Sequence, residues 1–307
     1  MLKKMFGLML FCGFLGPRMA LAEGISWSWD KPVTYQIMAQ VQLPELLQFN
    51  AAENIDARMV MFRFDLITTC TPVKNKGKKK VELICSMDDV RLLGQPIPQD
   101  KGQLALALKD YDTQLEDATL EVLMTRDGLV KRYDLIGIER SNRRRVQFEE
   151  NLMIVVARAL AGIDLQLPKG GIDKGSVWKQ KSILAMGFPS NQGTMRSSIL
   201  KSVVTATEAN SVVITSEGEG LMGSGVMIEI GGKTQPKTLY KMKMNGVARF
   251  DTATGSLLER EYLVEGVSTT SSAKIDSLTG MPYVQKIRVT RIDTMPDKFG
   301  ESGEIDR

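Results

Sequence analysis

The chain has 307 residues, with 40 basic against 36 acidic residues and no histidine. Histidine is the commonest general base and metal ligand in proteins, so its absence excludes Ser-His-Asp and Cys-His catalysis and leaves no reason to expect zinc, copper or haem. The near balance of charge is untypical of a protein dedicated to binding polyanions. We therefore expect no cofactor, no metal and no nucleic-acid partner.

The beginning of the chain has the pattern of a secretory signal peptide over residues 1–22. Lys3 and Lys4 precede an apolar run at residues 5–15, and residues 20–22 read Ala-Leu-Ala, a cleavage site of the small-x-small type. This pattern predicts an exported protein, periplasmic or extracellular.

Cleavage would leave a mature chain of about 285 residues with 37 basic against 36 acidic side chains, because Lys3, Lys4 and Arg18 leave with the signal. That length is sufficient for one large β domain or two smaller ones. No later apolar run approaches the roughly 20 residues that a membrane helix needs, so the mature chain is expected to have no transmembrane segment.

Alternation of apolar and polar residues runs through the first half of the mature chain and predicts strands with one buried face. The clearest case is the run from Val33 to Leu43. Further strands are predicted over residues 58–70, 80–93, 120–124 and 129–138, the last two flanking an Arg-Asp-Gly hairpin turn at 126–128. Residues 104–115 fit both a strand and a helix and stay undecided.

Cys70 and Cys85 remain after signal cleavage, and we predict a disulfide between them. An even pair in an oxidising compartment favours a structural bond, and the chain has no CxxC motif. A two-residue turn at Gly77 and Lys78 places residue 70 opposite residue 85 and aligns the apolar faces of both strands. In the chain-entropy treatment, closing this loop stabilises the fold by roughly 3 kcal/mol.

One helix is predicted over residues 142–162, after an N-cap at Ser141 or Asn142. Its apolar residues recur at helical spacing: Phe148, Leu152, Val155, Val156, Ala159, Leu160 and Ile163. The Pro-Lys-Gly-Gly run at 168–171 ends the pattern and marks a boundary between two halves. A helix with one apolar stripe needs a surface to pack on, most simply the concave face of a sheet.

The second half again alternates, which predicts strands over residues 176–186, 194–206, 211–217, 226–230, 239–250, 257–266 and 283–293. Asn245 and Gly246 resemble a hairpin turn, but the apolar phase continues across them. The unbroken phase favours one long strand with Gly246 at a bend or close approach. The hairpin turns are predicted instead at residues 251–255 and 276–280, which both read D-x-x-T-G.

These elements predict a mainly β protein of antiparallel sheets, curved or open-barrel-like, with one long amphipathic helix. The predicted organisation is a signal peptide (1–22), an N-terminal β-rich half with the disulfide hairpin and the helix (23–167), a C-terminal antiparallel β half (168–295) and a flexible tail (296–307). The pattern leaves open whether the halves form two domains or one curved sheet.

Five lysines lie at the tip of the disulfide hairpin: Lys74, Lys76, Lys78, Lys79 and Lys80. Solvated lysines at such a tip keep a sheet edge soluble. The alternative is contact with an anionic surface of lipid, lipopolysaccharide or wall polymer.

A second candidate site is glycine-rich and contains Gly218, Gly220, Gly223 and Gly225 among apolar residues. Such a segment forms either a sharply bent strand pair or a mobile apolar flap over a cavity. The 18 methionines of the chain fit either a forgiving core or an adaptable apolar pocket.

No motif identifies a catalytic residue. The S-x-x-K pairs of the chain lie in strand-like sequence without the further elements of a penicillin-binding site. Acidic pairs such as Asp88 with Asp89 and Glu149 with Glu150 leave open a His-free hydrolase that uses paired carboxylates.

Two motifs carry a resemblance to a known group of proteins. Residues 175–178 read Gly-x-x-Trp, and residues 246–255 read G-x-A-x-F-D-x-x-x-G. In these motifs, over roughly the C-terminal 130 residues, the chain resembles uncharacterised exported bacterial β-rich proteins of the domain-of-unknown-function type. The resemblance implies an exported β fold and no particular catalytic residues.

The expected function is non-enzymatic binding, in the cell envelope, of an apolar ligand or another envelope component. Curved sheets with a helical plug can hold acyl chains, as in periplasmic lipoprotein carriers, a comparison at the level of the fold alone. The alternatives are the His-free hydrolase and a structural or assembly partner in the envelope.

Overall fold

The computed structural model describes residues 25–46, 57–73, 80–94, 115–137, 163, 165–182, 198–223, 227–230, 233–236, 238–270, 280 and 282–294. Most of this part is strand. The strands in chain order are β1 (Val33–Leu46), β2 (Ala57–Val73), β3 (Lys80–Gly94), β4 (Thr119–Thr125), β5 (Val130–Ile136), β6 (Val177–Ser182), β7 (Ser198–Thr207), β8 (Ser211–Gly223), β9 (Met227–Ile230), β10 (Lys233–Pro236), β11 (Thr238–Asp251), β12 (Ser256–Thr270) and β13 (Pro282–Ile292).

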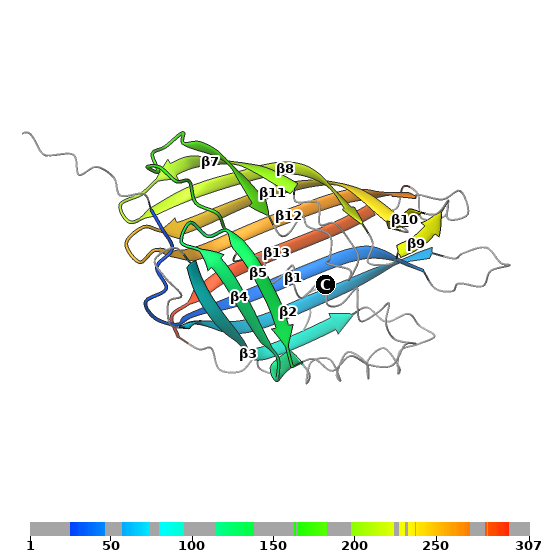
Figure 1. Ribbon diagram of the computed structural model, residues 1–307, viewed down its shortest axis with the longest axis horizontal. Coiled ribbons are helices and arrows are strands. Elements are labelled where there is room, and N and C mark those ends of the chain that lie inside the picture. Colours follow the sequence, from blue (N-terminus) through cyan, green and yellow to red (C-terminus); the bar gives the residue numbers. More distant parts are fainter. Residues whose placement is uncertain are drawn as a thin grey trace, which may run out of the picture.

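Eleven of these strands form one antiparallel sheet in the order β5-β4-β3-β2-β1-β13-β12-β11-β8-β7-β6, while β9 and β10 form a separate ribbon (Figure 1). The pairing of β1 with β13 joins the beginning of the described chain to its end. Both sequence halves therefore share one sheet, and the predicted domain boundaries stay a prediction.

The sheet is curled, so that the ends of its strand order come near each other. In Figure 1, β4 and β5 pass in front of β13 and β1 at a different tilt. The turn between β4 and β5 is hydrogen-bonded to the segment that leads into β6, through Leu167 N–H and Asp127 O at 2.6 Å. Since β5 and β6 are the two terminal strands, this contact joins the opposite ends of the sheet.

The alternation in the sequence sets which residues are buried. In β1, Val33, Tyr35, Ile37, Ala39 and Val41 are buried, whereas the polar residues between them are more exposed. A strand turns successive side chains to opposite faces, so one run of alternating residues supplies both a core face and a solvent face.

Strand β11 is continuous across Asn245 and Gly246, which confirms the prediction of one long strand. Gly246 lies opposite Tyr262 of β12, and a Cβ at residue 246 would lie 2.5 Å from the tyrosine ring. Only a residue without a side chain fits under that ring, so the glycine marks a close approach and not a turn.

Two predicted hairpin turns are confirmed, between β4 and β5 and between β11 and β12. Gly128 has φ of 89° and Gly255 has φ of 63°, values that favour glycine. The Asp251 carboxylate accepts hydrogen bonds from the backbone N–H groups of Ala253 and Thr254 at 2.9 and 3.1 Å. Most of the predicted turn at 276–280 lies outside the described residues.

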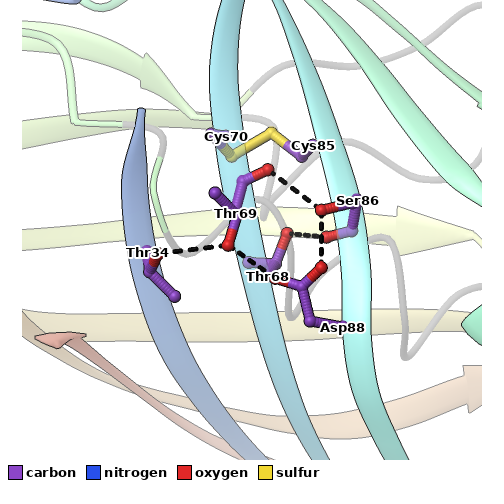
Figure 2. Close-up of a disulfide and its surroundings, with 7 residues drawn as sticks. All are labelled: Thr34, Thr68, Thr69, Cys70, Cys85, Ser86 and Asp88. Atoms are coloured by element: carbon purple, nitrogen blue, oxygen red, sulfur yellow. Dashed lines mark hydrogen bonds between the residues drawn. A yellow bond between two sulfur atoms is a disulfide. The ribbon is translucent and has the colours of Figure 1, made fainter. Parts of the chain in front are cut away.

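The predicted disulfide is confirmed. Cys70 of β2 lies directly opposite Cys85 of β3, with their Cα atoms 3.9 Å apart, and the two side chains are bonded. Figure 2 shows the bond beside a polar cluster in which Thr69 donates to Asp88 at 2.5 Å and Thr68 donates to the carbonyl of Ser86 at 2.7 Å. The disulfide and these hydrogen bonds, at neighbouring positions along the strands, therefore fix the register of β2 against β3.

The long amphipathic helix in the predicted fold class is wrong for the part of the chain that the structure describes. There, only Leu115 and Glu116 and the single 3₁₀ residue Ile163 are helical, and residues 142–162 lie outside the described residues. Short segments outside the strands, at 27–29, 115–118, 163 and 165–172, supply buried apolar side chains to the core instead. Helical spacing is a local property of a sequence and does not determine which segment covers a sheet.

Candidate functional site

One face of the large sheet is buried, and we call it the inner face. Each of its eleven strands contributes at least one buried side chain, and most of these side chains are apolar. The central strands contribute Ile37, Ala39, Val41, Phe64, Leu66, Ile214, Met242, Met244, Ala248, Val264, Ile287 and Val289, which belong to one continuous core cluster.

A charged and an aromatic residue lie together in the middle of this apolar face. The Arg260 side chain is 1% exposed, and its guanidinium carbon lies 3.8 Å from the centre of the Tyr262 ring, a cation–π contact. Tyr262 is 2% exposed, and its hydroxyl has no hydrogen-bond partner in the described part of the chain. Nearby on the same face, Tyr283 donates to Gln285 at 2.7 Å.

A row of buried polar side chains leads from the inner face to the edge strand β6. Ser202 and Ser216 are hydrogen-bonded across β7 and β8 at 2.8 Å, and Gln180 of β6 donates to Ser216 at 3.3 Å. The amide oxygen of Gln180 accepts the backbone N–H of Gln166 at 3.0 Å. The row thus connects the sheet to the segment that precedes β6.

Residues 165–167, which we call the strap, cross the β4–β5 turn. Leu165 and Leu167 are buried in the core, while the Gln166 side chain donates to the Asp127 carboxylate at 3.1 Å. A Cβ at Gly128 would lie 2.1 Å from the Leu165 carbonyl oxygen. The strap can therefore lie on this turn only because residue 128 is glycine.

Two tryptophans donate hydrogen bonds to successive carbonyls of the strap. The Trp27 indole donates to the Leu165 carbonyl and the Trp178 indole donates to the Gln166 carbonyl, both at 2.8 Å. Trp27 also stacks on Trp29, with ring centres 5.3 Å apart. The strap therefore has partners from the N-terminal segment, the β4–β5 turn and β6.

The side chain of Asp127, in the β4–β5 turn, accepts a hydrogen bond from the strap. Burial raises the pKa of its carboxyl group, but hydrogen bonds from Thr125 and Gln166 and the nearby charge of Lys169 outweigh burial and hold the pKa below its ordinary value. The carboxylate is therefore the stable form at neutral pH and acts as a hydrogen-bond acceptor for Gln166.

A second acidic group fixes the β11–β12 turn. Burial raises the pKa of the Asp251 carboxyl group, but hydrogen bonds from Thr254 and Ala253 and the charge of Arg291 together lower it below its ordinary value. Arg291 of β13 lies 3.4 Å from the Asp251 carboxylate and donates to Ser256 at 2.6 Å. This cluster ties the turn to the neighbouring strand.

Tyr35 of β1 is fully buried on the inner face. Burial strongly raises the pKa of its phenol, although the charge of Arg291 and a backbone hydrogen bond at Leu257 oppose that effect. Tyr35 therefore stays neutral in the folded protein.

The outer face carries a shallow hollow of about 570 Å³, lined by Lys179, Ile199, Lys201, Glu217, Gly218, Glu219, Lys243 and Asn245. Three of these lining residues are lysines and two are glutamates, and Lys201 pairs with Glu217 at 3.6 Å. An ion pair between two side chains as exposed as these contributes little stability.

The structure describes only some of the candidate site residues that the sequence predicts. Lys80 is exposed at the start of β3, and Lys74, Lys76, Lys78 and Lys79 lie outside the described residues. Gly218, Gly220 and Gly223 lie in β8, each opposite a residue of β11, and Gly225 lies outside the described residues. These positions therefore do not test the predicted contact of the lysines with an anionic surface or the predicted flap in the glycine-rich segment.

Sequence reasoning did not identify the Arg260–Tyr262 pair or the strap. Arg260 is in phase with Tyr262 and Val264, so the alternation itself indicated that its side chain points inward. Within the described residues, no group of three or more His, Cys, Asp or Glu side chains is placed to hold a metal ion. The same residues contain no helix that is long and apolar enough to cross a membrane.

Comparison with known proteins does not assign the chain to a family. No family model and no curated protein matches the chain. A solved structure titled "Lipid-protein interactions in lipovitellin" is similar over 89% of this chain, with 9% identity and a TM-score of 0.48, and the chain spans 26% of that protein. DynF from the dynemicin biosynthesis pathway of Micromonospora chersina is similar over 93% of this chain and 92% of its own, with 6% identity and a TM-score of 0.20. Both likenesses are too distant to carry an argument, and the resemblance to uncharacterised exported β-rich proteins stays a prediction.

Proposed function

We propose that this chain is an exported, non-enzymatic protein of the cell envelope that binds an apolar ligand against the inner face of its curled sheet. Export rests on the signal-peptide pattern at residues 1–22. Binding rests on the composition of the inner face, which combines a broad apolar surface with a few buried polar groups. Small-molecule sites in proteins have this composition.

The observation that carries the proposal is the buried Tyr262 hydroxyl. A buried donor without a partner costs about 1–3 kcal/mol, so such a group in a folded protein calls for an explanation. An apolar ligand with one polar end would supply the missing acceptor. The guanidinium of Arg260, stacked on the same ring, favours an acceptor that is negatively charged.

The surroundings of Tyr262 favour an adaptable site. Met242 and Met244 are buried in the adjoining strand β11, and methionine side chains adjust to ligands of different shape. Gly246 and Gly266 lie opposite residues of neighbouring strands where larger side chains would crowd Tyr262 and Met242. Small and flexible residues are thus concentrated around the polar pair.

Binding is tested with delipidated protein and a fluorescent fatty acid. We expect saturable uptake by the wild-type chain and about five- to tenfold weaker uptake by Tyr262→Phe, which removes the hydroxyl and keeps the ring. Because that hydroxyl has no described partner, Tyr262→Phe should not lower the free energy of unfolding. Folded wild-type protein that takes up no probe would reject the proposal.

A further inference from the structure

The strap places its own apolar side chains in the core that the inner face forms. Leu165 is fully buried and Leu167 is 1% exposed, and both belong to the same cluster as Ile37, Val264 and Val289. Gln166 between them is only partly buried, and its side chain donates a hydrogen bond to Asp127 in the β4–β5 turn. The strap therefore contributes two buried leucines to the core that the inner face forms, near the junction between the ends of the sheet.

The strap is held by separate hydrogen bonds and not by a ladder. Five of them join it to four residues: Leu167 N–H to the Asp127 carbonyl at 2.6 Å, the Gln166 amide to the Asp127 carboxylate at 3.1 Å, the Gln166 N–H to Gln180 at 3.0 Å, and the two indole bonds from Trp27 and Trp178 at 2.8 Å. Each bond can be lost without disturbing a strand pair of the sheet. Segments held in this way open more readily than core strands.

We infer that the strap is a competitive plug: the apolar ligand displaces Leu165 and Leu167 from the inner face, and the bonds to the β4–β5 turn and β6 set how readily it does so. This inference rests on the proposed function. A ligand that binds only the strap-open state has an apparent affinity reduced by the small fraction of molecules in that state. Weakening the strap must then strengthen ligand binding.

The tryptophans make strap release directly observable. The chain has three tryptophans, and the indole N–H groups of Trp27 and Trp178 donate to strap carbonyls. Protein labelled with ¹⁵N-tryptophan is titrated with sodium palmitate below its micelle-forming concentration. We expect faster hydrogen exchange of both indole protons in the palmitate complex than in the free protein.

Gln166→Ala removes the side-chain bond to Asp127 and leaves the backbone bonds of the strap in place. Loss of one hydrogen bond should raise the apparent affinity for palmitate about fivefold. Gln40→Ala is the matched control, since the exposed Gln40 of β1 donates to Met61 of β2 and lies far from the strap in sequence and register. Its affinity for palmitate should equal that of the wild type.

Gln166→Glu is a second variant of the same size, in case Gln166→Ala does not fold. It places a second carboxylate beside Asp127 and should also raise the affinity at neutral pH. Palmitate binding with unchanged exchange of both indole protons, and equal affinity in all variants, would overturn the plug while leaving the proposed function intact. Binding by Gln166→Ala but not by the wild type would support the plug, and binding by none of the chains would overturn both inferences.

Discussion

The crowding of Gly128 by the strap gives a prediction whose size can be worked out from the structure. An alanine at residue 128 would keep φ near 89°, which costs roughly 1–2 kcal/mol for a residue with a Cβ. That Cβ would also lie 2.1 Å from the Leu165 carbonyl oxygen and 2.4 Å from the Trp27 indole nitrogen. The strap must then move, and the bond between those two groups, worth about 1 kcal/mol, is lost along with some burial of Leu165. We expect Gly128→Ala to lower the free energy of unfolding by about 3–5 kcal/mol.

Gly175→Ala is the matched control. Gly175 has φ of 91°, but a Cβ there would meet nothing within 4 Å. It should therefore cost only the backbone strain, roughly 1–2 kcal/mol. Gly170→Ala, with an ordinary φ and open space, should change stability by less than about 0.5 kcal/mol.

The assay is urea denaturation of the three variants and the wild type, followed by tryptophan fluorescence. Gly128→Ala should have a midpoint clearly below that of Gly175→Ala, with a similar slope. Equal midpoints for these two variants would show that backbone strain alone accounts for the effect. The placement of the strap on the β4–β5 turn would then be refuted.

Three further changes test the fold. Replacing Cys70 and Cys85 together by alanine should lower the free energy of unfolding by about 2–5 kcal/mol, and equal urea midpoints with and without the bond would contradict its stabilising role. Gly246→Ala should cost about 1–3 kcal/mol, because its Cβ would overlap the Tyr262 ring, and an unchanged thermal midpoint would show that the ring moves freely. The lowered pKa of Asp251 means that its charged form stabilises the fold above about pH 4 and that this stability is lost as the pH falls further. Asp251→Asn should therefore be less stable at pH 7 and lose less on acidification, and acid unfolding curves of the two proteins that run parallel would contradict this.

The strands were predictable because their cause is local. Residues 33–43 alternate strictly, and β1 buries the predicted apolar positions that the structure describes. The Cys70–Cys85 pair was predictable for a similar reason, since two alternating runs and the turn predicted at Gly77 and Lys78, which lies outside the described residues, define one register. The continuity of β11 followed from the unbroken apolar phase on both sides of Gly246.

The order of the strands was not predictable, because it depends on contacts between distant segments. Nothing near Val33 or Ile292 in the sequence indicates that β1 and β13 are neighbours. The bulge between Ile67 and Thr68 shifts the pairing of β2 with β3 by one residue, which alternation within a single strand cannot show.

The candidate site escaped prediction for two physical reasons. Arginine is ordinarily a surface residue, and the stacking of Arg260 on Tyr262, which accompanies its burial, forms only in three dimensions. The Gly128 turn was visible in the sequence, but the strap that lies on it comes from residues 165–167, and the contact forms only when the sheet curls. The predicted long helix is not among the elements that the described residues form, and the converse reason applies, since a clear local period contains no information about tertiary coverage.

The most direct test of ligand binding at the inner face is native mass spectrometry of the protein purified, without detergent, from cells that export it. The spectrum should contain a species heavier than the mature polypeptide by the mass of one small amphiphile, which disappears when the protein is denatured and is found in the organic extract. A single species at the polypeptide mass, together with an extract free of amphiphiles and no uptake of added fatty acid, would contradict the account.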